Sequence, residues 1–475
     1  MSQTGYKPKA FLMTQLTAFR LNGLYGYKSL GIGCQEKASI ILAENGVGKT
    51  TLLNTLYALL SGRTSRLVSV DFKDAVLTFG DDEIVFAREQ AFKSTQSLDM
   101  NQLLAKRPAR ELIEYGARPD QLMEMVTAYI EGGQARVTRM PVFRRIFTSS
   151  PFDEDDIFQR LERLRTVMYD SAYMADFRKK VIEAMGGVQV LYLPTYRRIE
   201  ANFEDVSLAR NAAPRRRGAT ELSETEPERD ELIFFGLSDV EEKLAAMTQF
   251  IQRSMVEAYS KLSGNLIDTL LDTRQYELDL DQAFDLEAVR LMLGRLGKSN
   301  TVTENNLERA IKGARLADER YRPLAYFLRE LLRSYEASRP QELAIEAFAE
   351  VVNAYLGSGD SPEKLLRFDK VRLKVEIWHD ALQKALPFGS LSSGEKQIVS
   401  VFSRLLLDFD KRYLILIDEP ELSLSIEWQR RFLPDILQTN SCAQLIAITH
   451  SPFVFENELD SLAQSIGISR EVKLP

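Results

Sequence analysis

Cysteine and histidine are scarce in this chain of 475 residues, which has two of each: Cys34, Cys442, His379 and His450. Disulfide frameworks and zinc centres gather several thiolates or imidazoles in one place, so this composition excludes both. It also argues against a histidine-metal nuclease of the HNH type within the chain. The few cysteines fit a reducing compartment, and we expect a cytoplasmic protein.

Long hydrophobic runs and a surplus of positive charge are also missing. The longest apolar runs, such as YLILI at 413–417, fall far short of the roughly 20 residues that span a bilayer. The N-terminal MSQTGYKPKA has no signal-peptide core, so we expect no membrane association. The net charge of −7 excludes a polycation that coats nucleic acid, and the basic segments at 136–147, 177–180 and 214–218 are expected to be solvated surface.

Alternating strand and helix patterns predict an α/β fold. The first 90 residues have short apolar runs typical of strands, one helix, and a hairpin at 74–89 with its turn at 80–82. Helical spacing takes over from about residue 100, and a buried strand is expected at 188–198. The polar stretch at 210–231 is typical of a loop. Strand character returns at 370–378 and then alternates with helix.

Apolar residues spaced by threes and fours predict helices from 237 to about 356. They are Val240, Leu244, Met247, Ile251, Met255, Ala258 and Leu262, followed later by Leu324, Phe327, Leu328, Leu331 and Leu332. These stripes are expected to pack helix against helix, as a short coiled-coil-like region and not as a long arm.

The stretch ILAENGVGKTTLLN at 41–54 has the order of a phosphate-binding loop: a buried strand, a glycine turn and a helix. Backbone N–H groups and the positive end of the helix dipole bind phosphates there. Lys49 would neutralise the β and γ phosphates, and the Thr50 hydroxyl would ligate Mg²⁺. Such loops usually begin with glycine where this chain has Ala43, so the backbone must adopt a conformation there that alanine allows. The expected nucleotide contacts are Asn45, Gly46, Val47, Gly48, Lys49, Thr50 and Thr51.

Two apolar strands near the C-terminus end in polar residues that suit phosphate hydrolysis. The first, RYLILIDEPELSLS at 412–425, ends in Asp418 and Glu419. Asp418 can hold Mg²⁺ through water, and Glu419 can orient the attacking water and act as its general base. The second, CAQLIAITHS at 442–451, ends in His450, which would reach the γ phosphate. The expected catalytic residues are Glu419, Asp418 and His450, and the expected metal ligands are Thr50 and Asp418.

A further anion-binding helix start is predicted by LSSGEKQIVSVFSRLLLDF at 391–409. Its first residues, Ser392, Ser393, Gly394 and Glu395, are expected to contact nucleotide. One phosphate loop does not need a second anion-binding end for the same phosphate. We therefore expect this helix to serve the nucleotide of a partner molecule.

Together these motifs resemble those of the ABC-type ATPases of the SMC, RecF and OLD group. AENGVGKTT resembles Walker A, LSSGEKQ the ABC signature, LILIDEPE Walker B, LSLS at 422–425 the D-loop and ITHS the H-loop strand. In that group two head domains sandwich two ATP molecules, each held by the Walker motifs of one subunit and the signature of the other. The resemblance implies an α/β fold, an ABC-type P-loop NTPase head with two lobes and a mixed sheet, with ATP and Mg²⁺ as cofactors.

This resemblance also implies a head interrupted by mainly helical insertions. The expected division is an N-terminal ATPase lobe at 1–100, a helical insertion at 101–185, a central strand at 186–205, a short coiled-coil-like insertion at 206–365 and a C-terminal ATPase lobe at 366–475.

The chain departs from the group in two places. Where relatives often carry a glutamine after the central strand, this chain offers Thr195, Tyr196 and Arg197, with Gln90 as an alternative. Where close relatives often have histidine after LSL, it has Ser425.

The compact size and the DEPELSL and YLPTYRR stretches resemble the stand-alone ATPases of bacterial anti-phage systems such as PARIS and Septu. Those proteins form ATP-dependent multimers that hold or license a separate nuclease. Only a short tail follows His450, so the Toprim domain of OLD nucleases is not expected. The resemblance implies a slow ATPase that assembles into a dimer or a higher homo-oligomer such as a hexamer, senses a phage-derived trigger and controls a separate effector nuclease.

Two alternatives stay open. One is a DNA-repair ATPase of the RecF or SMC kind that binds DNA across the dimer through the segments at 136–147 and 177–180. Its affinity for DNA would fall steeply with salt. The other is a scaffold in which ATP binding, and not turnover, is the signal.

Overall fold

The computed structural model describes residues 15–34, 37–44, 46–93, 104–168, 172–194, 237–271, 284–295, 297, 301–312, 318–358 and 363–470. Asn45, the stretch at 195–197 and the loop expected at 210–231 lie outside these described residues. Within the described part of the chain, no helix is long and apolar enough to cross a membrane.

An antiparallel sheet of five strands is built mainly from the N-terminal part of the chain. Its order is β13-β2-β1-β4-β5, and each neighbouring pair is antiparallel. The strands are β1 (Leu16–Leu24), β2 (Lys28–Gly33), β4 (Asp74–Phe79), β5 (Asp82–Ala87) and β13 (Gly467–Arg470). The predicted hairpin at 74–89 is confirmed as β4 and β5, which turn at Gly80, whose φ of 58° suits glycine.

A second sheet of five strands is parallel throughout and joins distant parts of the chain, in the order β12-β3-β11-β10-β6. Its strands are β3 (Ala38–Leu42), β6 (Gln189–Leu193), β10 (Tyr413–Asp418), β11 (Cys442–Thr449) and β12 (Ala463–Ser465). The expectation of one mixed sheet is corrected, because parallel and antiparallel pairs occur in separate sheets. Short turns join β1 to β2 and β4 to β5, whereas parallel neighbours need longer crossovers.

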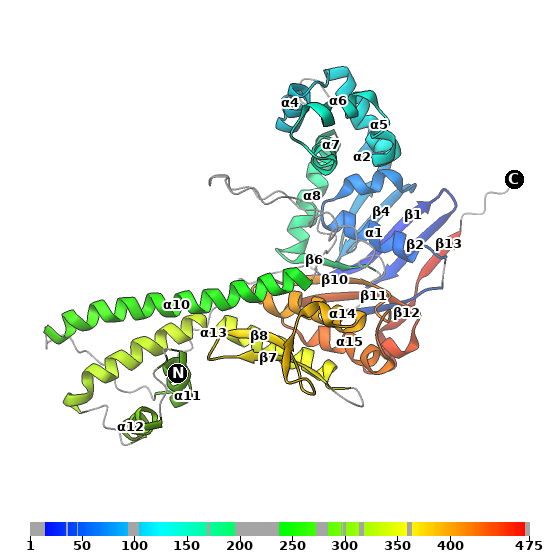
Figure 1. Ribbon diagram of the computed structural model, residues 1–475. Helices are drawn as coiled ribbons and strands as arrows, with labels where there is room; N and C mark the ends of the chain where they lie inside the picture. Colours follow the sequence, from blue (N-terminus) through cyan, green and yellow to red (C-terminus); the bar gives the residue numbers. More distant parts are fainter. Residues whose placement is uncertain are drawn as a thin grey trace.

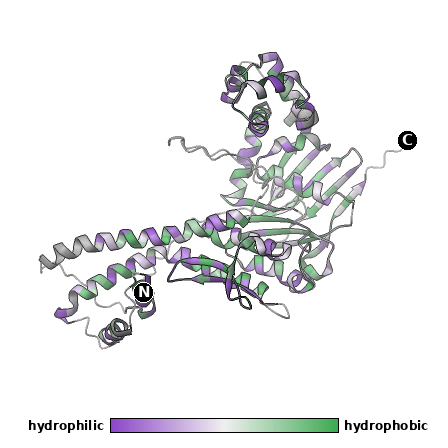
Figure 2. Ribbon diagram, in the orientation of Figure 1, coloured by the Kyte–Doolittle hydropathy of each residue, from purple (hydrophilic) through white to green (hydrophobic). Residues whose placement is uncertain are grey.

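Both faces of the parallel sheet are buried. In β10, Ile415 and Ile417 belong to a hydrophobic core shared with α14 (Ser393–Leu407) and α15 (Ile426–Gln438), whereas Leu414 and Leu416 belong to a second core shared with α1 (Lys49–Leu60). Successive side chains of a strand point to opposite faces, so a strand covered on both sides is apolar throughout. Figure 2 shows hydrophobic residues gathered in these central strands.

The register of the parallel sheet brings three strand ends together. Asp418 of β10 pairs with Ile448 of β11, and Thr449 of β11 pairs with Leu42 of β3. The chain therefore leaves β3, β10 and β11 at one edge of the sheet.

A small antiparallel sheet, in the order β7-β8-β9, lies beside this core. Its strands are β7 (Lys364–Asp369), β8 (Lys374–His379) and β9 (Lys384–Leu386). The strand predicted across 370–378 was wrong for 370–373, which form the turn between β7 and β8. Asp369 Oδ1 accepts hydrogen bonds from the N–H groups of Val371 and Arg372, and Leu373 has a φ of 52°. Short 3₁₀ helices are η1 (Thr64–Ser69), η4 (Glu319–Tyr321), η5 (Phe388–Ser390), η6 (Pro452–Val454) and η7 (Asp460–Leu462).

One group of helices, residues 104–168, has a hydrophobic core of its own; we call it the helical module. It contains α4 (Arg107–Glu114), α5 (Pro119–Val137), α6 (Pro141–Ser149) and α7 (Glu154–Met168). Its core includes Leu112, Met125, Ile146 and Leu161, each fully buried. Figure 1 shows it standing away from the sheets beyond α2 (Arg88–Lys93), with α8 (Ala172–Met185) leading back to β6.

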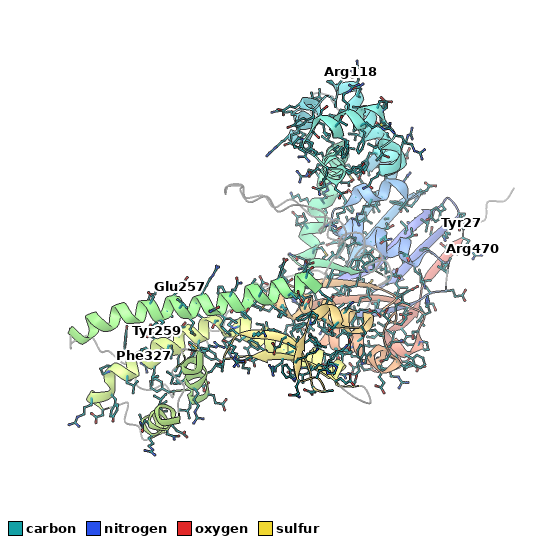
Figure 3. The ribbon with its side chains drawn as sticks, in the orientation of Figure 1. Tyr27, Arg118, Glu257, Tyr259, Phe327 and Arg470 are labelled. Carbon is teal, nitrogen blue, oxygen red and sulfur yellow. The ribbon has the colours of Figure 1, made fainter. Side chains whose placement is uncertain are left out.

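A second group of helices, which we call the helical arm, comprises two long helices, α10 (Leu237–Leu271) and α13 (Arg322–Leu356), and two shorter ones, α11 (Leu286–Arg295) and α12 (Thr301–Lys312). α10 and α13 lie side by side and extend away from the sheets (Figure 1), and 35 residues each make them about 50 Å long. The predicted stripe of α10 is buried at Val240, Leu244, Met247 and Ile251. Farther out the helix is more exposed, as at Tyr259 (Figure 3), so the arm is anchored by the half nearest the sheets.

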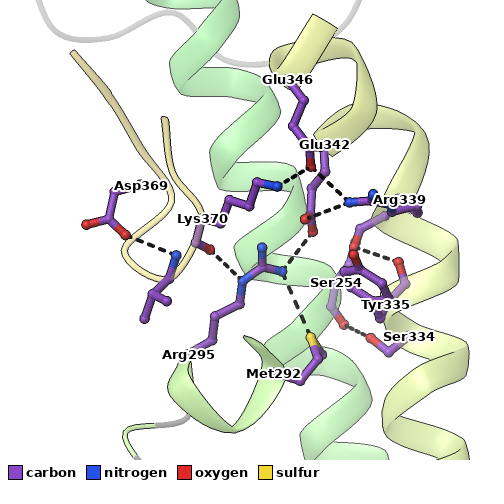
Figure 4. Close-up of polar contacts among 12 residues, drawn as sticks. Ser254, Met292, Arg295, Ser334, Tyr335, Arg339, Glu342, Glu346, Asp369 and Lys370 are labelled. Atoms are coloured by element: carbon purple, nitrogen blue, oxygen red, sulfur yellow. Dashed lines mark hydrogen bonds and ion pairs between the residues drawn. The ribbon is translucent and has the colours of Figure 1, made fainter. Parts of the chain in front are cut away.

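Buried charges join the helices of the arm to the β7–β8 turn (Figure 4). Arg295 and Glu342, whose side chains are 2% and 0% exposed, form an ion pair of 2.8 Å. Arg295 Nε also donates to the carbonyl oxygen of Lys370 at 2.8 Å, and Lys370 Nζ lies 3.2 Å from Glu346 Oε1. One network therefore ties α11 and α13 to the small sheet that precedes α14 in the chain.

Candidate nucleotide-binding site

The segment predicted to bind phosphate lies between β3 and α1, and the predicted order of strand, turn and helix is confirmed. Gly46 and Gly48 have φ angles of 81° and 106°, which glycine adopts without strain, and Gly48 is the residue before the first turn of α1. Ala43 is buried and is not among the residues with positive φ, so it fits its position in the loop. Val47 and Thr51 lie in the loop and the first turn of α1. The backbone N–H groups at this helix start suit an anion.

Lys28, which the sequence did not single out, supports this loop. It is 8% exposed, and its Nζ donates to the carbonyl oxygen of Val47 at 3.0 Å. A Cβ atom at Gly48 would lie 3.6 Å from the same Nζ and 3.4 Å from Leu30 Cδ1, so the loop packs closely on β2. A lysine in a strand carries no local signal of such a contact.

The carboxylates at the end of β10 meet the loop. Thr50 Oγ1 donates to Asp418 Oδ2 at 2.9 Å, and Lys49 Nζ lies 3.4 Å from Glu419 Oε1. Glu419 has a φ of 54°, which is unusual for a residue with a side chain, and its N–H donates to the carbonyl oxygen of Ile448 at 2.9 Å. That bond fixes Glu419 against the neighbouring strand β11.

His450, just after β11, lies between Lys49 and Glu419. Lys49 Nζ lies 2.7 Å from Nδ1 of the ring, and Nε2 lies 3.3 Å from Glu419 Oε1. A neutral imidazole that accepts at Nδ1 and carries its proton on Nε2 satisfies both neighbours. The structure thus brings together Lys49, Thr50, Asp418, Glu419 and His450.

The signature residues form a second group at the start of α14. Ser392 caps the helix: its Oγ accepts from the Glu395 N–H, and Glu395 Oε2 accepts from the Ser392 N–H at 2.6 Å. Lys364 of β7 lies 3.0 Å from the same carboxylate oxygen. Ser392 and Ser393 are exposed and can meet a ligand, as an anion-binding helix start requires.

Gly394 is required by the chain itself, whatever it contacts in a partner. A Cβ there would lie 2.4 Å from the carbonyl oxygen of Ser423 and 3.4 Å from the Trp428 ring. Ser423, with a φ of 66°, belongs to the turn after β10. The start of α14 is therefore pressed against the predicted D-loop.

The oxygen donors of the first group fit Mg²⁺. This ion is usually held by one or two carboxylates together with phosphate oxygens and water, so Asp418 and the Thr50 hydroxyl suffice. Within the described residues, no group of three or more Asp, Glu, His or Cys residues suggests a metal site made by protein alone. Relatives often carry a glutamine that contacts Mg²⁺ and water, and four residues were considered for that position. Gln90 is exposed in α2, and the other three, at 195–197, lie outside the described residues.

Comparison with known proteins finds one family model, described as "AAA domain, putative AbiEii toxin, Type IV TA system", which matches residues 267–456. The match covers less than half of the chain; it includes the signature, Asp418, Glu419 and His450, but not the phosphate loop. No curated protein matches. Among solved structures, the chain is similar to the Smc head domain with an extended coiled coil bound to the C-terminal domain of ScpA, from Pyrococcus furiosus. That similarity has 13% identity over 96% of each chain and a TM-score of 0.31, too low to support an argument. The family match supports a likeness to P-loop ATPases of the AAA type.

Proposed function

We propose that this chain is an ABC-type ATPase that binds and hydrolyses ATP, dimerises through composite ATP sites and controls a separate effector nuclease in bacterial anti-phage defence. The observation that carries the ATPase part is the contact among Lys49, Glu419 and His450, which lie up to 401 positions apart in the chain. A phosphate loop beside a strand-end carboxylate pair and a histidine is the arrangement that phosphoryl transfer to water needs.

Each residue of this group has a role in the proposed hydrolysis. The N–H groups at the start of α1 and the Lys49 ammonium bind the phosphates, and Thr50 and Asp418 would hold Mg²⁺, which supplies charge neutralisation when bound. Glu419 accepts a proton from the attacking water. His450 holds Glu419 in place through its Nε2–H. The strained backbone of Glu419, with a φ of 54°, would pre-organise its carboxylate for this role.

Dimerisation is supported by the exposed start of α14. Ser392 and Ser393 present a capped helix N-terminus, which would meet the γ phosphate of a nucleotide bound to the other subunit. The proposal also includes an effector nuclease as partner and a phage-derived trigger. They rest on the sequence resemblance and on the two helical regions, which extend away from the sheets and leave surfaces for partners (Figure 1).

The test is the mass of Glu419→Gln in solution, measured by light scattering with and without ATP and Mg²⁺. The amide keeps the geometry but cannot take the proton, so ATP should convert monomer to a trapped dimer. Lys49→Ala should not respond, since it cannot hold the phosphates. Ser392→Arg should bind ATP yet stay monomeric, because arginine fills the helix start. Normal dimerisation of Ser392→Arg, or an assembly that ATP does not change, would overturn the composite site.

Binding of DNA across the dimer is the second candidate, and the exposed Arg139, Arg144 and Arg145 of the helical module favour it. The other basic segment favours it less, because Lys180 pairs with Asp176 and Lys179 with Glu183. Titration of labelled duplex DNA at low and moderate salt decides: steep salt dependence supports this candidate, and negligible affinity at low salt removes it.

A further inference from the structure

The end of β11 is held by a carboxylate, Glu421, which belongs to the segment that resembles Walker B but has been given no role there. Glu421 lies three residues after Asp418, in the turn that leaves β10. Its Oε2 accepts a hydrogen bond from Thr449 Oγ1 at 2.8 Å, and its Oε1 accepts one from the His450 N–H at 3.1 Å. The Glu421 side chain therefore accepts hydrogen bonds from two successive residues, Thr449 and His450, at the end of the strand that positions the His450 imidazole.

The hydrogen bonds around Thr449 show that Glu421 acts as an acceptor. The Ser451 N–H donates to Thr449 Oγ1 at 3.0 Å, so the threonine oxygen is already an acceptor and its hydrogen is directed to Glu421. Thr449 is fully buried, and a hydroxyl there needs this partner. Two donors thus converge on Glu421, and a carboxylate is the side chain that accepts both.

Gln429 of α15 holds the backbone from which Glu421 extends. Its Nε2 donates to the carbonyl oxygens of Glu421 at 3.3 Å and Leu424 at 3.0 Å, and its Oε1 accepts from Ser451 Oγ at 2.8 Å. The turn after β10 and the turn after β11 are therefore bridged twice, once by Glu421 and once by Gln429. Both turns end beside the predicted nucleotide.

We infer that Glu421 is a positioning residue for the proposed hydrolysis: it sets His450 between Lys49 and Glu419 by accepting two hydrogen bonds, and Gln429 supports it. The inference rests on the proposed function for its effect on turnover, but the geometry that it describes can be tested without turnover. A positioning role needs acceptors and not charge. Glutamine can replace Glu421 only in part, because its Oε1 can accept from the His450 N–H, whereas its amide NH₂ cannot accept from Thr449 Oγ1.

Turnover separates positioning from catalysis. Glu421→Leu should lower kcat about 10- to 100-fold, as loss of an orienting partner commonly does, with KM changed less than about threefold. Glu421→Gln should lose less turnover than Glu421→Leu, because it keeps an acceptor for the His450 N–H, and far less than Glu419→Gln. Glu427→Leu, an exposed glutamate in the first turn of α15, is the matched control and should have no effect. Equal kcat for Glu421→Leu and Glu427→Leu would overturn the inference, and so would loss of turnover in Glu421→Gln as complete as in Glu419→Gln.

The two histidines of the chain provide a readout that does not need activity. Protein labelled with ¹⁵N-histidine should give two sets of imidazole signals, and His379→Asn assigns them. Glu421→Leu should shift the His450 signals and leave those of His379, whereas Glu421→Gln should shift the His450 signals less and also leave those of His379. If the wild type neither binds nor hydrolyses ATP but Glu421→Leu still shifts His450, the proposed function fails and the positioning stands. If the His450 signals do not move in a folded Glu421→Leu protein, the positioning fails whatever the turnover.

Discussion

The helical module and the helical arm are attached to the sheets in different ways. The module, at 104–168, packs around its own core. Among the described residues, neither of the two cores beside the parallel sheet includes a residue of the module. The arm enters the main core through Ile251 of α10 and Phe348 of α13, which pack in the same cluster as Ile398 of α14. We therefore expect movement of the arm to disturb the packing of α14, whereas the module can change with little effect there.

The largest expected effects test this comparison by replacing one buried phenylalanine in each region with alanine. Phe348→Ala and Phe143→Ala should each cost about 3–5 kcal/mol locally, because both side chains are almost fully buried. Phe348→Ala should also weaken ATP-induced association, since its cavity adjoins α14. Phe143 stacks on Phe158 within the module, so its loss should spare that association. Light scattering with and without ATP measures the association and thermal melting measures the stability; an equal loss of association in both variants would contradict the comparison.

Buried charge gives the second contrast. Glu342→Ala should cost about 3 kcal/mol, near the lower end for a broken buried ion pair, because Arg295 keeps its bond to the Lys370 carbonyl. Glu111→Ala in the module should cost about 1 kcal/mol of stability. Glu111 pairs with Arg107 and Arg160, but 24% of its side chain is exposed. Urea unfolding of each variant measures the difference, and a larger loss for Glu111→Ala would show that the arm network is not a structural link.

The smallest expected effect is a pH-dependent loss of stability at the ion pair between Lys243 of the arm and Asp408 at the end of α14. Burial would raise the pKa of Asp408, but the hydrogen bond from Lys243 and the charges of Arg404, Lys243 and Lys411 outweigh it and lower the pKa. A lowered folded pKa adds stability that is full above the unfolded value of about 3.9 and is lost as pH falls through the folded pKa.

Asp408→Asn should therefore destabilise the protein by about 1–2 kcal/mol at pH 7. The difference from wild type should begin to shrink below about pH 4, where the aspartate of the unfolded chain becomes protonated, and should be lost as the pH falls through the lowered pKa of the folded state. Lys243→Met is the matched control, because it removes the arm's side of the link and leaves Arg404 in place. Melting temperatures between pH 3 and pH 7 test the trend, and a difference that grows toward acid pH would reverse the sign of the argument.

Much of the fold followed from local patterns. The hairpin at 74–89, the strand before the phosphate loop and the buried stripe from Val240 to Ile251 were predicted because hydrophobic period and turn residues act within a few positions. The turn at 370–373 was not, since Asp369 bonds its own backbone there and breaks an otherwise strand-like run. The separation of parallel from antiparallel strands also escaped prediction, because pairing joins segments hundreds of residues apart.

The sequence by itself determined which residues could hold phosphates, since glycines, a lysine and a helix start act locally, and strand patterns ended at Asp418 and His450. Only the tertiary structure decided that Lys28 supports the loop, that Glu421 and Gln429 bridge two turns, and that Arg295 meets Glu342. Those contacts join polar side chains that no local period marks. Their partners are chosen by the packing of the sheets and helices, because a buried charge or hydroxyl must find a partner wherever the fold places it.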